Sequence, residues 1–265
     1  MTNLASPTPY PEVNATLAAL LDGAQAILGS RFVGMYLYGS LAAGDFNLGR
    51  SDIDFAIVTD GELSAETVDA LRTLHTDLAG SGLEWAPKLE GVYVPQAMLR
   101  RDEPGAVPCP QLNEGQFFME PLGPGGVILR DVLQRQGVTV AGPPPQSLID
   151  PIAADDLQQA VLGIFHGWWE PMLDDPSWLR EQDGYRAFAV LSMCRTLYTL
   201  QFGLGASKPV AARWAQQVIQ PYAGLIEEAT QWHYGMPFGH MDDTLAFVRY
   251  TQEEIRGFEQ DRADD

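Results

Sequence analysis

Basic residues are scarce in this sequence. Its 265 residues include 16 Lys and Arg against 35 Asp and Glu, which gives a formal net charge of -19. Nucleic-acid binding depends on Lys and Arg that neutralise backbone phosphates, so this balance argues against a nucleic-acid partner. The negative charge permits a cationic substrate. High solubility is an equally simple explanation of the same excess.

Cysteines and long apolar runs are also lacking. The two cysteines, Cys109 and Cys194, lie far apart and in no CxxC or CxxH pattern. Their spacing argues against a disulfide framework and against a structural zinc site. No apolar run approaches the length that spans a membrane, and no basic-then-apolar leader opens the sequence. We therefore expect a cytoplasmic protein without a membrane partner, and we expect it to be a monomer.

The first half alternates helical patterns with short apolar runs that favour strands. The region 101–126 is rich in Pro and Gly and is predicted to be a long loop. Together these patterns predict an α/β domain with a mixed sheet. The predicted elements are a helix over 11–28, strands over 32–38 and 53–58, a helix over 64–80, a strand over 89–94, a short helix over 127–133 and a small strand over 138–140.

The second half shows helical periodicity and no strand candidate. A proline cluster at 142–145 separates the two patterns, and we place the domain boundary there. The sequence thus predicts an α+β fold, with an α/β domain over 1–146 followed by an α-helical bundle over 147–265. The predicted bundle helices cover 155–170, 184–200, 208–218 and 244–258.

One motif lies between the first two predicted strands. The turn Gly39-Ser40 ends the first apolar run, and Ser51-Asp52-Ile53-Asp54 leads into the second. Asp52 and Asp54 are two residues apart on a predicted strand, so both carboxylates point to the same face. Carboxylate oxygens suit a hard divalent cation. A Gly-Ser turn suits a phosphate, so the motif predicts a nucleotide-handling site.

Glu90, in the third predicted strand, is the best candidate for a third acidic partner. Strands of one sheet can bring their carboxylates together, but three converging carboxylates repel each other strongly. Such a cluster makes sense if one or two Mg²⁺ ions neutralise it, which makes Asp52, Asp54 and Glu90 the candidate metal ligands. Glu90 could also accept the proton of an attacking hydroxyl.

The motif Gly39-Ser40 with Ser51-Asp52-Ile53-Asp54 resembles that of the DNA polymerase β-like nucleotidyltransferase superfamily. The context Tyr38-Gly39-Ser40, together with the segments 191–198 and 207–215, is similar to the aminoglycoside adenylyltransferases that modify streptomycin and spectinomycin. The resemblance covers roughly residues 30–235. That family joins an N-terminal nucleotidyltransferase domain to a C-terminal helical bundle, which is the order predicted above from the patterns alone.

The resemblance implies roles for individual residues on the nucleotide side. Ser40 and Ser51 would contact the phosphates of ATP, next to Gly39. Asp52 and Asp54 would hold Mg²⁺, and Glu90 matches the catalytic base. Lys208, at a predicted helix start, matches a lysine that reaches the nucleotide phosphates. Tyr234, or its neighbour His233, lies near a position of the family that touches the nucleotide.

The resemblance also implies that aromatic and acidic residues early in the helical domain grip a cationic acceptor. Carboxylates beside an aromatic face suit an ammonium or guanidinium group. We select Trp168, Asp174 and Asp175 as acceptor-binding residues, although Trp168 or Trp169 could instead pack in the core. Arg195 could pair with a buried carboxylate or approach a phosphate. The wider set of candidates includes Trp169, Glu170, Glu181 and Asp183.

These inferences predict an adenylyltransferase that depends on ATP and Mg²⁺. It would transfer AMP from ATP to a hydroxyl of a small cationic acceptor, such as an aminoglycoside antibiotic, and release pyrophosphate. One alternative keeps this chemistry and changes the acceptor to a protein or another metabolite. A second alternative is a non-catalytic nucleotide-binding module similar to an antitoxin.

Overall fold

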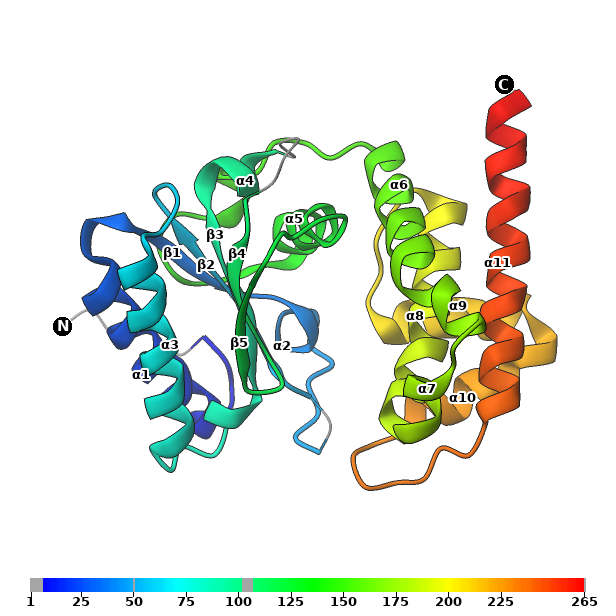
Figure 1. Cartoon of the computed structure of the whole chain (residues 1–265), viewed down its shortest axis with the longest axis horizontal. Coiled ribbons are helices and arrows are strands. Elements are labelled where there is room, and N and C mark those ends of the chain that lie inside the picture. The colour runs from blue at the N-terminus through cyan, green and yellow to red at the C-terminus, as the bar shows by residue number, and fades with distance from the viewer. Residues whose placement is uncertain (1–6, 50, 102–106, 265) are drawn as a thin grey trace. The chain divides into compact units, whose positions relative to one another are not determined.

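The computed structural model describes residues 7–49, 51–101 and 107–264. The chain divides into two compact units, Met1–Pro151 and Ile152–Asp265. The first unit contains a six-stranded mixed sheet with helices, and the described part of the second is helical (Figure 1). The predicted α+β fold class is therefore confirmed. Within the described ranges, no helix combines the length and the apolar character needed to cross a membrane.

The sheet of the first unit has the strand order β5-β4-β3-β2-β1-β6. Strands β2 and β3 pair in parallel, and the other neighbouring strands pair antiparallel. The parallel pair lies in the middle, where both strands are covered, as is usual for parallel strands. The strands are β1 (Phe32–Leu37), β2 (Ile53–Thr59), β3 (Leu89–Pro95), β4 (Cys109–Asn113), β5 (Gln116–Glu120) and β6 (Val138–Ala141).

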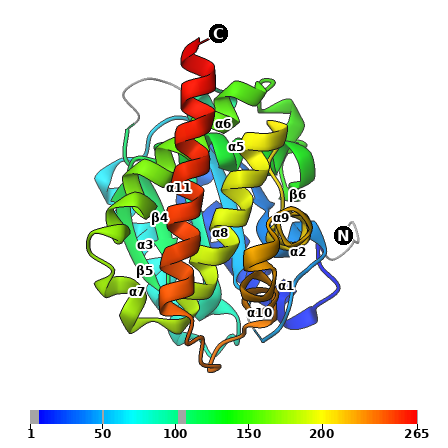
Figure 2. The ribbon, with the colours of Figure 1, turned by 90° about the vertical axis from the view of Figure 1, so that its right-hand side faces the viewer.

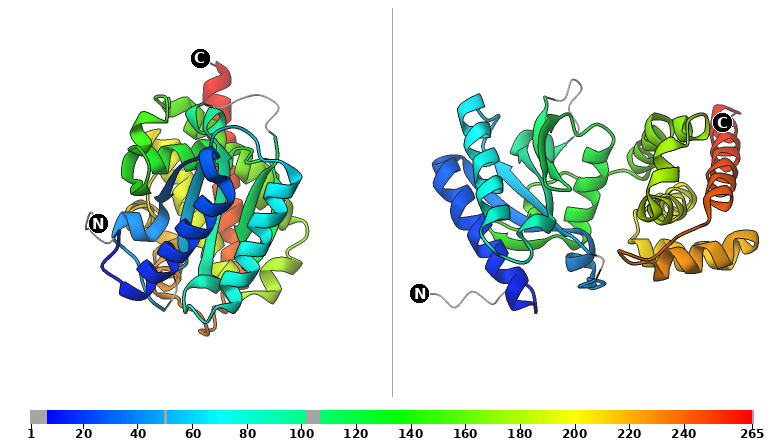
Figure 3. Two further views of the ribbon diagram at one scale, coloured as in Figure 1. Left: turned by 90° about the vertical axis from the view of Figure 1, so that its left-hand side faces the viewer. Right: turned by 60° about the horizontal axis from the view of Figure 1, so that its bottom comes forward.

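The helices α1 (Pro11–Leu28) and α3 (Ala65–Gly80) lie side by side on one face of this sheet (Figure 3, left). Alternate strand residues such as Phe55 and Tyr93 are fully buried in the core on this face. Successive strand residues point to opposite faces, so the residues between them point to the other face. Helix α5 (Gly125–Gln136) covers that second face (Figure 1). The shorter helices of this unit are η1 (Gly29–Arg31), α2 (Gly39–Ala43), η2 (Ala86–Lys88), α4 (Gln96–Arg100) and η3 (Pro145–Ser147).

The predicted loop over 101–126 is wrong in its second part. There β4 and β5 form a hairpin, while residues 102–106 lie outside the described residues. The hairpin was missed because β4 begins Cys109-Pro110 and neither strand alternates cleanly between apolar and polar residues. Proline is depleted in strands and Asn-Gly or Asp-Gly is the usual hairpin turn, whereas this hairpin turns at Glu114-Gly115.

The second unit is built around one long helix, α8 (Asp183–Phe202), which contacts α6, α7, α9, α10 and α11 (Figure 2). Arg186, on α8, is buried and donates to the backbone carbonyls of Leu179 and Phe238, so it ties helix α7 and the loop before α11 to α8. Helices α7 and α10 were not predicted. The remaining elements are α6 (Ala154–Ile164), the π-helix η4 (Phe165–Trp169), η5 (Glu170–Leu173), α7 (Ser177–Glu181), α9 (Lys208–Val218), η6 (Gln220–Tyr222), α10 (Ala223–Gln231) and α11 (Met241–Asp264).

Candidate active site

The parallel pairing of β2 and β3 places two acidic residues side by side. Asp54 and Glu90 are direct partners in the register, and both are half-buried. They alternate with the core residues Phe55 and Leu89, so they project from the face of the sheet opposite α1 and α3. Paired positions on neighbouring strands are about 5 Å apart, which brings the two carboxylates within reach of one ligand. The predicted convergence of these residues rests on this register.

The Gly-Ser turn lies directly against Asp54. The backbone N–H of Tyr38 donates to the Asp54 carbonyl at 3.1 Å, which continues the β1–β2 pairing to the start of α2. Gly39 has a φ of 61°, in the left-handed region, and a Cβ on it would overlap the Asp54 carboxylate. Glycine is therefore required at position 39 for its backbone conformation and for the close approach. Ser40 follows in the first turn of α2 and is half-buried.

A short closed loop leads into β2. The Ser51 N–H donates to the Asn47 carbonyl at 2.9 Å, and the Ser51 hydroxyl accepts the Asn47 N–H at 3.0 Å. These bonds fix the backbone immediately before Asp52, which precedes the first residue of β2. Ser51 and Asp52 are thus held next to the strand that carries Asp54.

Electrostatic repulsion is strong around Glu90. Burial, followed by the charges of Asp52 and Asp54, raises the pKa of Glu90 to about 7. Burial and the same kind of repulsion, from Asp54 and Glu90, also raise the pKa of the Tyr38 phenol. The carboxylates are therefore close enough to shift one another's protonation, as expected for like charges that share a site.

Glu114 is a residue of this site that the sequence reasoning missed. It lies in the β4–β5 turn with a φ of 48°, a conformation that costs a non-glycine residue about 1 kcal/mol. Its backbone N–H hydrogen-bonds the Glu90 carboxylate and lowers the pKa of Glu90, while its own charge raises it. Strain of this kind is concentrated at functional sites. The adjacent acid and glycine between two short strands were the only sequence signal.

The site fits a divalent cation by its chemistry. Within the described ranges, no three His, Cys, Asp or Glu side chains are already gathered as a closed metal cage. Asp52, Asp54 and Glu90 nevertheless supply hard oxygen donors, and their mutual repulsion is what a bound cation would relieve. Mg²⁺ keeps several waters and binds through one or two carboxylates plus substrate phosphates, so it needs no closed cage.

In the second unit, Lys208 is the first residue of α9 and is exposed. Its ammonium lies 4.9 Å from the centre of the Phe188 ring. The first turn of α9 carries no acidic residue, so its N-terminus favours an anion. Arg195 donates from Nε to the Ala206 carbonyl at 3.2 Å, which anchors the loop before α9.

Tyr234 lies on the loop that precedes α11. Its side chain is 57% exposed, and its ring meets that of Trp232 edge-on at 5.4 Å. His233, the alternative at this position, is also exposed. Exposed aromatic rings are common stacking surfaces for the flat rings of ligands.

The acceptor candidates separate into exposed and structural residues. Trp168 is 51% exposed, and its indole N–H donates to the Tyr185 hydroxyl. Trp169 is buried, so it packs in the core and does not face an acceptor. Asp174 and Asp175 are exposed, but the Asp175 carboxylate accepts the Ser177 N–H at the start of α7. Hydrogen bonds from the Ser177 side chain and then from its backbone lower the pKa of Asp175.

Two of the wider acceptor candidates already have structural partners. Glu170 accepts hydrogen bonds from His166 and Gln252. Asp183 pairs with Arg186. Of the candidates as a whole, Trp168, Asp174, Asp175 and Glu181 are exposed.

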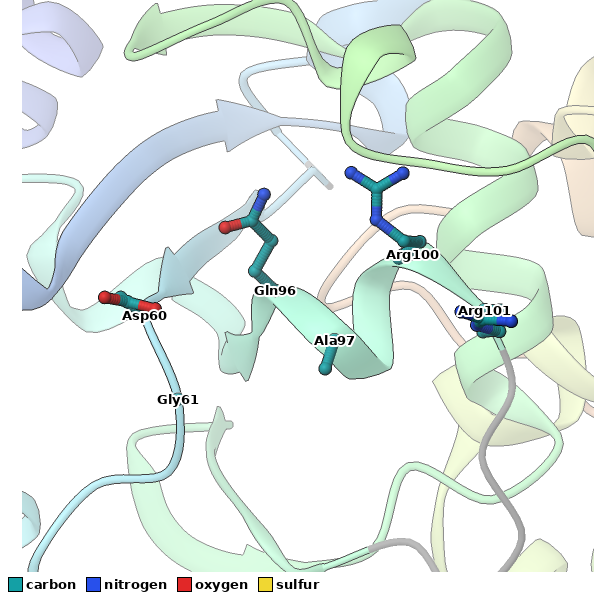
Figure 4. Close-up of a pocket in the computed structure, with 6 residues that line it drawn as sticks. All are labelled: Asp60, Gly61, Gln96, Ala97, Arg100 and Arg101. Carbon is teal, nitrogen blue, oxygen red and sulfur yellow. The ribbon is translucent and has the colours of Figure 1, made fainter.

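A pocket of about 360 Å³ lies at the other end of the parallel strands. It is lined by Asp60 after β2 and by Gln96, Arg100 and Arg101 in and after α4 (Figure 4). The seven residues of β2 span about 20 Å, so this pocket is distant from Asp54 and Glu90. Arg100 already pairs with Asp150 at 3.2 Å. The pocket is therefore not the site that the carboxylates form.

A Gly-Ser turn set against paired carboxylates on neighbouring strands of a mixed sheet defines a nucleotidyltransferase. Residues 24–90 match the model of the nucleotidyltransferase domain, and residues 147–255 match that of the aminoglycoside adenylyltransferase C-terminal domain. Both matches support the aminoglycoside adenylyltransferase family that the sequence predicted, and the chain is an enzyme of the nucleotidyltransferase class.

Individual relatives agree with this assignment. An aminoglycoside (3'') (9) adenylyltransferase of Shigella flexneri is 26% identical over 92% of this chain and 95% of its own length. One of Klebsiella pneumoniae is 30% identical over 48% of this chain and 47% of its own. A spectinomycin adenyltransferase of Enterococcus faecialis, solved with ATP and spectinomycin, has the same fold, with a TM-score of 0.70, 17% identity and coverage of 91% and 98%.

Proposed function

We propose that this protein transfers AMP from ATP to a hydroxyl of an aminoglycoside and releases pyrophosphate. The observation that carries the proposal is the pairing of Asp54 with Glu90 directly against the Gly39-Ser40 turn. The family to which the second unit belongs supports an aminoglycoside as the acceptor. The structure of the Enterococcus enzyme, which was solved with ATP and spectinomycin, supports ATP as the donor.

In the proposed reaction, an acceptor hydroxyl attacks the α-phosphorus of ATP. A new P–O bond forms to the acceptor, the bond to the β-phosphate breaks, and pyrophosphate leaves. Glu90 takes the proton of the attacking hydroxyl. A general base works best when its pKa lies near the working pH, and burial together with the neighbouring aspartates raises the pKa of Glu90 toward that range before a cation binds.

Asp52 and Asp54, with Glu90 beside them, would hold Mg²⁺. The bound ion would supply charge stabilisation at the phosphates. Gly39, Ser40 and Ser51 form the proposed cradle for the triphosphate. Turns with exposed backbone N–H groups are common phosphate sites, and serine hydroxyls add further donors.

Lys208 and Tyr234 are proposed to bind ATP from the second unit, Lys208 at a phosphate and Tyr234 by ring contact. The exposure of both side chains and the acid-free N-terminus of α9 support these roles. For the acceptor we propose Trp168, Asp174 and Asp175, with Asp174 the better placed of the two acids because the Asp175 carboxylate already accepts the Ser177 N–H. Glu114 adds an exposed carboxylate beside Glu90, where a cationic acceptor would present its hydroxyl.

The test is a transfer assay on a mixture of aminoglycosides. The enzyme is incubated with ATP and Mg²⁺, and mass spectrometry looks for an acceptor that has gained one AMP. Asp52→Asn and Glu90→Gln should each reduce transfer by at least about 10³-fold, because each removes a charged group that acts on the reacting atoms. Both variants should keep their circular dichroism spectrum. Normal turnover in both would refute the assignment of the site.

A further inference from the structure

An aromatic ring of the second unit lies under the proposed phosphate-binding lysine. Phe188 is on α8 and is 37% exposed, and Lys208 begins α9. The Lys208 ammonium lies 4.9 Å from the ring centre, within the range of a cation–π interaction. The two residues come from different helices, so the contact fixes the lysine relative to α8.

The Phe188 ring is itself held in place by other rings. It packs against Trp169 and Tyr185, each with ring centres 5.6 Å apart from its own. Trp169 is buried, and it also contacts Tyr185 at 5.7 Å. Such contacts fix ring orientation, since aromatic pairs have preferred geometries. Lys208 therefore lies over a surface that does not need to rearrange.

The position of Lys208 is unfavourable for helix stability. A cation at a helix N-terminus meets the positive end of the macrodipole, at a cost of about 0.3–1 kcal/mol. The contact with Phe188 offsets a cost of this size, because exposed cation–π contacts contribute about 0.5–1 kcal/mol. The Arg195 bond to Ala206 holds the preceding loop, so the backbone at this point is also fixed.

We propose that Phe188 is a positioning residue that holds the Lys208 ammonium ready for the triphosphate of ATP. The inference rests on the proposed role of Lys208 in ATP binding. A lysine side chain carries about 2 kcal/mol of rotamer entropy, and part of this is lost whenever the ammonium is fixed on a ligand. The ring restricts the side chain before ATP arrives, so less of this entropy remains to be lost on binding.

The test compares ATP affinity in four single variants and one double variant, by calorimetry with Mg²⁺ and ATP and by KM for ATP. Phe188→Leu should weaken ATP binding by roughly threefold and leave kcat unchanged, the size of one exposed cation–π contact. Phe188→Tyr keeps a ring and should restore the affinity. Phe202→Leu is the control. It removes another exposed ring of α8, whose described ring contacts are with Tyr198 and Trp214, and it should leave ATP affinity unchanged.

The fourth variant is Lys208→Gln, which should weaken ATP binding by itself. Phe188→Leu should have no further effect in the Lys208→Gln background, since its role is exerted through the lysine. If the two changes add independently, or if Phe188→Leu alone has no effect, Phe188 is not a positioning residue and Lys208 keeps its proposed role. If Lys208→Gln leaves ATP affinity unchanged, the role of Lys208 and the inference both fail. Direct binding needs no acceptor, so an error about the acceptor does not affect this test.

Discussion

At the scale of single residues, Glu90 is defined by what surrounds it. Burial and two neighbouring aspartates raise its pKa, and the Glu114 N–H lowers it. Before a cation binds, these opposing effects bring the pKa of Glu90 to about 7. Such a group can take a proton from a hydroxyl and remain a moderate acid afterwards. An isolated glutamate at its ordinary pKa would be a weaker base.

The acidic side chain of Glu114 leads to a prediction about the acceptor. Glu114→Gln should raise KM for a cationic acceptor by about tenfold, because one charge-assisted contact is lost. KM for ATP and kcat should change little, since glutamine keeps the backbone N–H that bonds Glu90. Steady-state kinetics with varied acceptor and saturating ATP gives the values.

Glu120→Gln is the matched control for this change. Glu120 is exposed at the end of β5, on the same hairpin. The Glu120→Gln substitution removes the same charge at a greater distance from Glu90. The KM for the acceptor should therefore stay within about twofold of the wild-type value, as expected for a screened surface charge. Equal effects of the two substitutions would mean that only the overall charge matters.

At the scale of elements, the sequence predicts those strands and helices that a local pattern of apolar residues determines. Strands β1, β2 and β3 are recognisable because six or seven mostly apolar residues are buried on both faces of the sheet. The β4–β5 hairpin is not recognisable, because β4 carries a proline, β5 has no buried residue, and the hairpin is held by the pairing of β4 with β3. The missed hairpin is also why Glu114 was missed, since the pairing of β4 with β3 is what brings it to Glu90.

The packing of α3 on the sheet includes an ionisable residue in the core. His75, on α3, is 6% exposed and hydrogen-bonds the Tyr93 hydroxyl on β3 at 2.8 Å. It stacks on Phe55 and lies near Phe117, so rings surround it. Burial lowers the pKa of His75 from 6.5 to about 4. The native protein therefore holds this residue neutral.

This packing predicts a dependence of stability on pH. Between pH 6.5 and 4 the unfolded chain binds a proton at His75 and the native state does not, so the free energy of unfolding falls as the pH falls. The contribution of neutral, buried His75 to the free energy of unfolding is fully present above pH 6.5. About 2–3 kcal/mol of this free energy is lost by pH 4.5. Urea unfolding of the protein and of His75→Phe at pH 7.5 and 4.5 measures it.

The His75→Phe variant separates this effect from the titration of the many carboxylates. At pH 7.5 it should be less stable by about 1 kcal/mol, because the Tyr93 hydroxyl loses its partner. At pH 4.5 it should be the more stable of the two proteins. An equal loss of stability in both proteins on acidification would show that His75 accepts its proton in the native state.

At the scale of the whole molecule, the proposed site draws on residues that are far apart in the sequence. The proposed metal and base residues can be picked out from the sequence because they lie within one motif and one neighbouring strand. The proposed acceptor residues are harder to pick out, since exposure separates the candidates and periodicity does not reveal it. Trp168 and Trp169 are adjacent, yet the π-helix η4 exposes one and buries the other.

The charge of the whole chain predicts opposite effects of salt on the two substrates. A net charge of -19 attracts a cationic acceptor and repels ATP, and both effects weaken as salt screens them. Between about 0.01 M and 0.1 M salt the Debye length falls from about 30 to 10 Å. KM for an acceptor with two positive charges should rise roughly fivefold over this range, while KM for ATP should stay constant or fall.

Steady-state kinetics at fixed pH and fixed free Mg²⁺ measures both constants. The contrast in sign is the informative result, because a general effect of salt on folding or on chemistry would move both constants in the same direction. An acceptor analogue with fewer positive charges is the control, and its KM should respond less to salt. If acceptor KM does not depend on salt, binding relies on local contacts such as Trp168 and Glu114, and the acidic surface serves solubility alone.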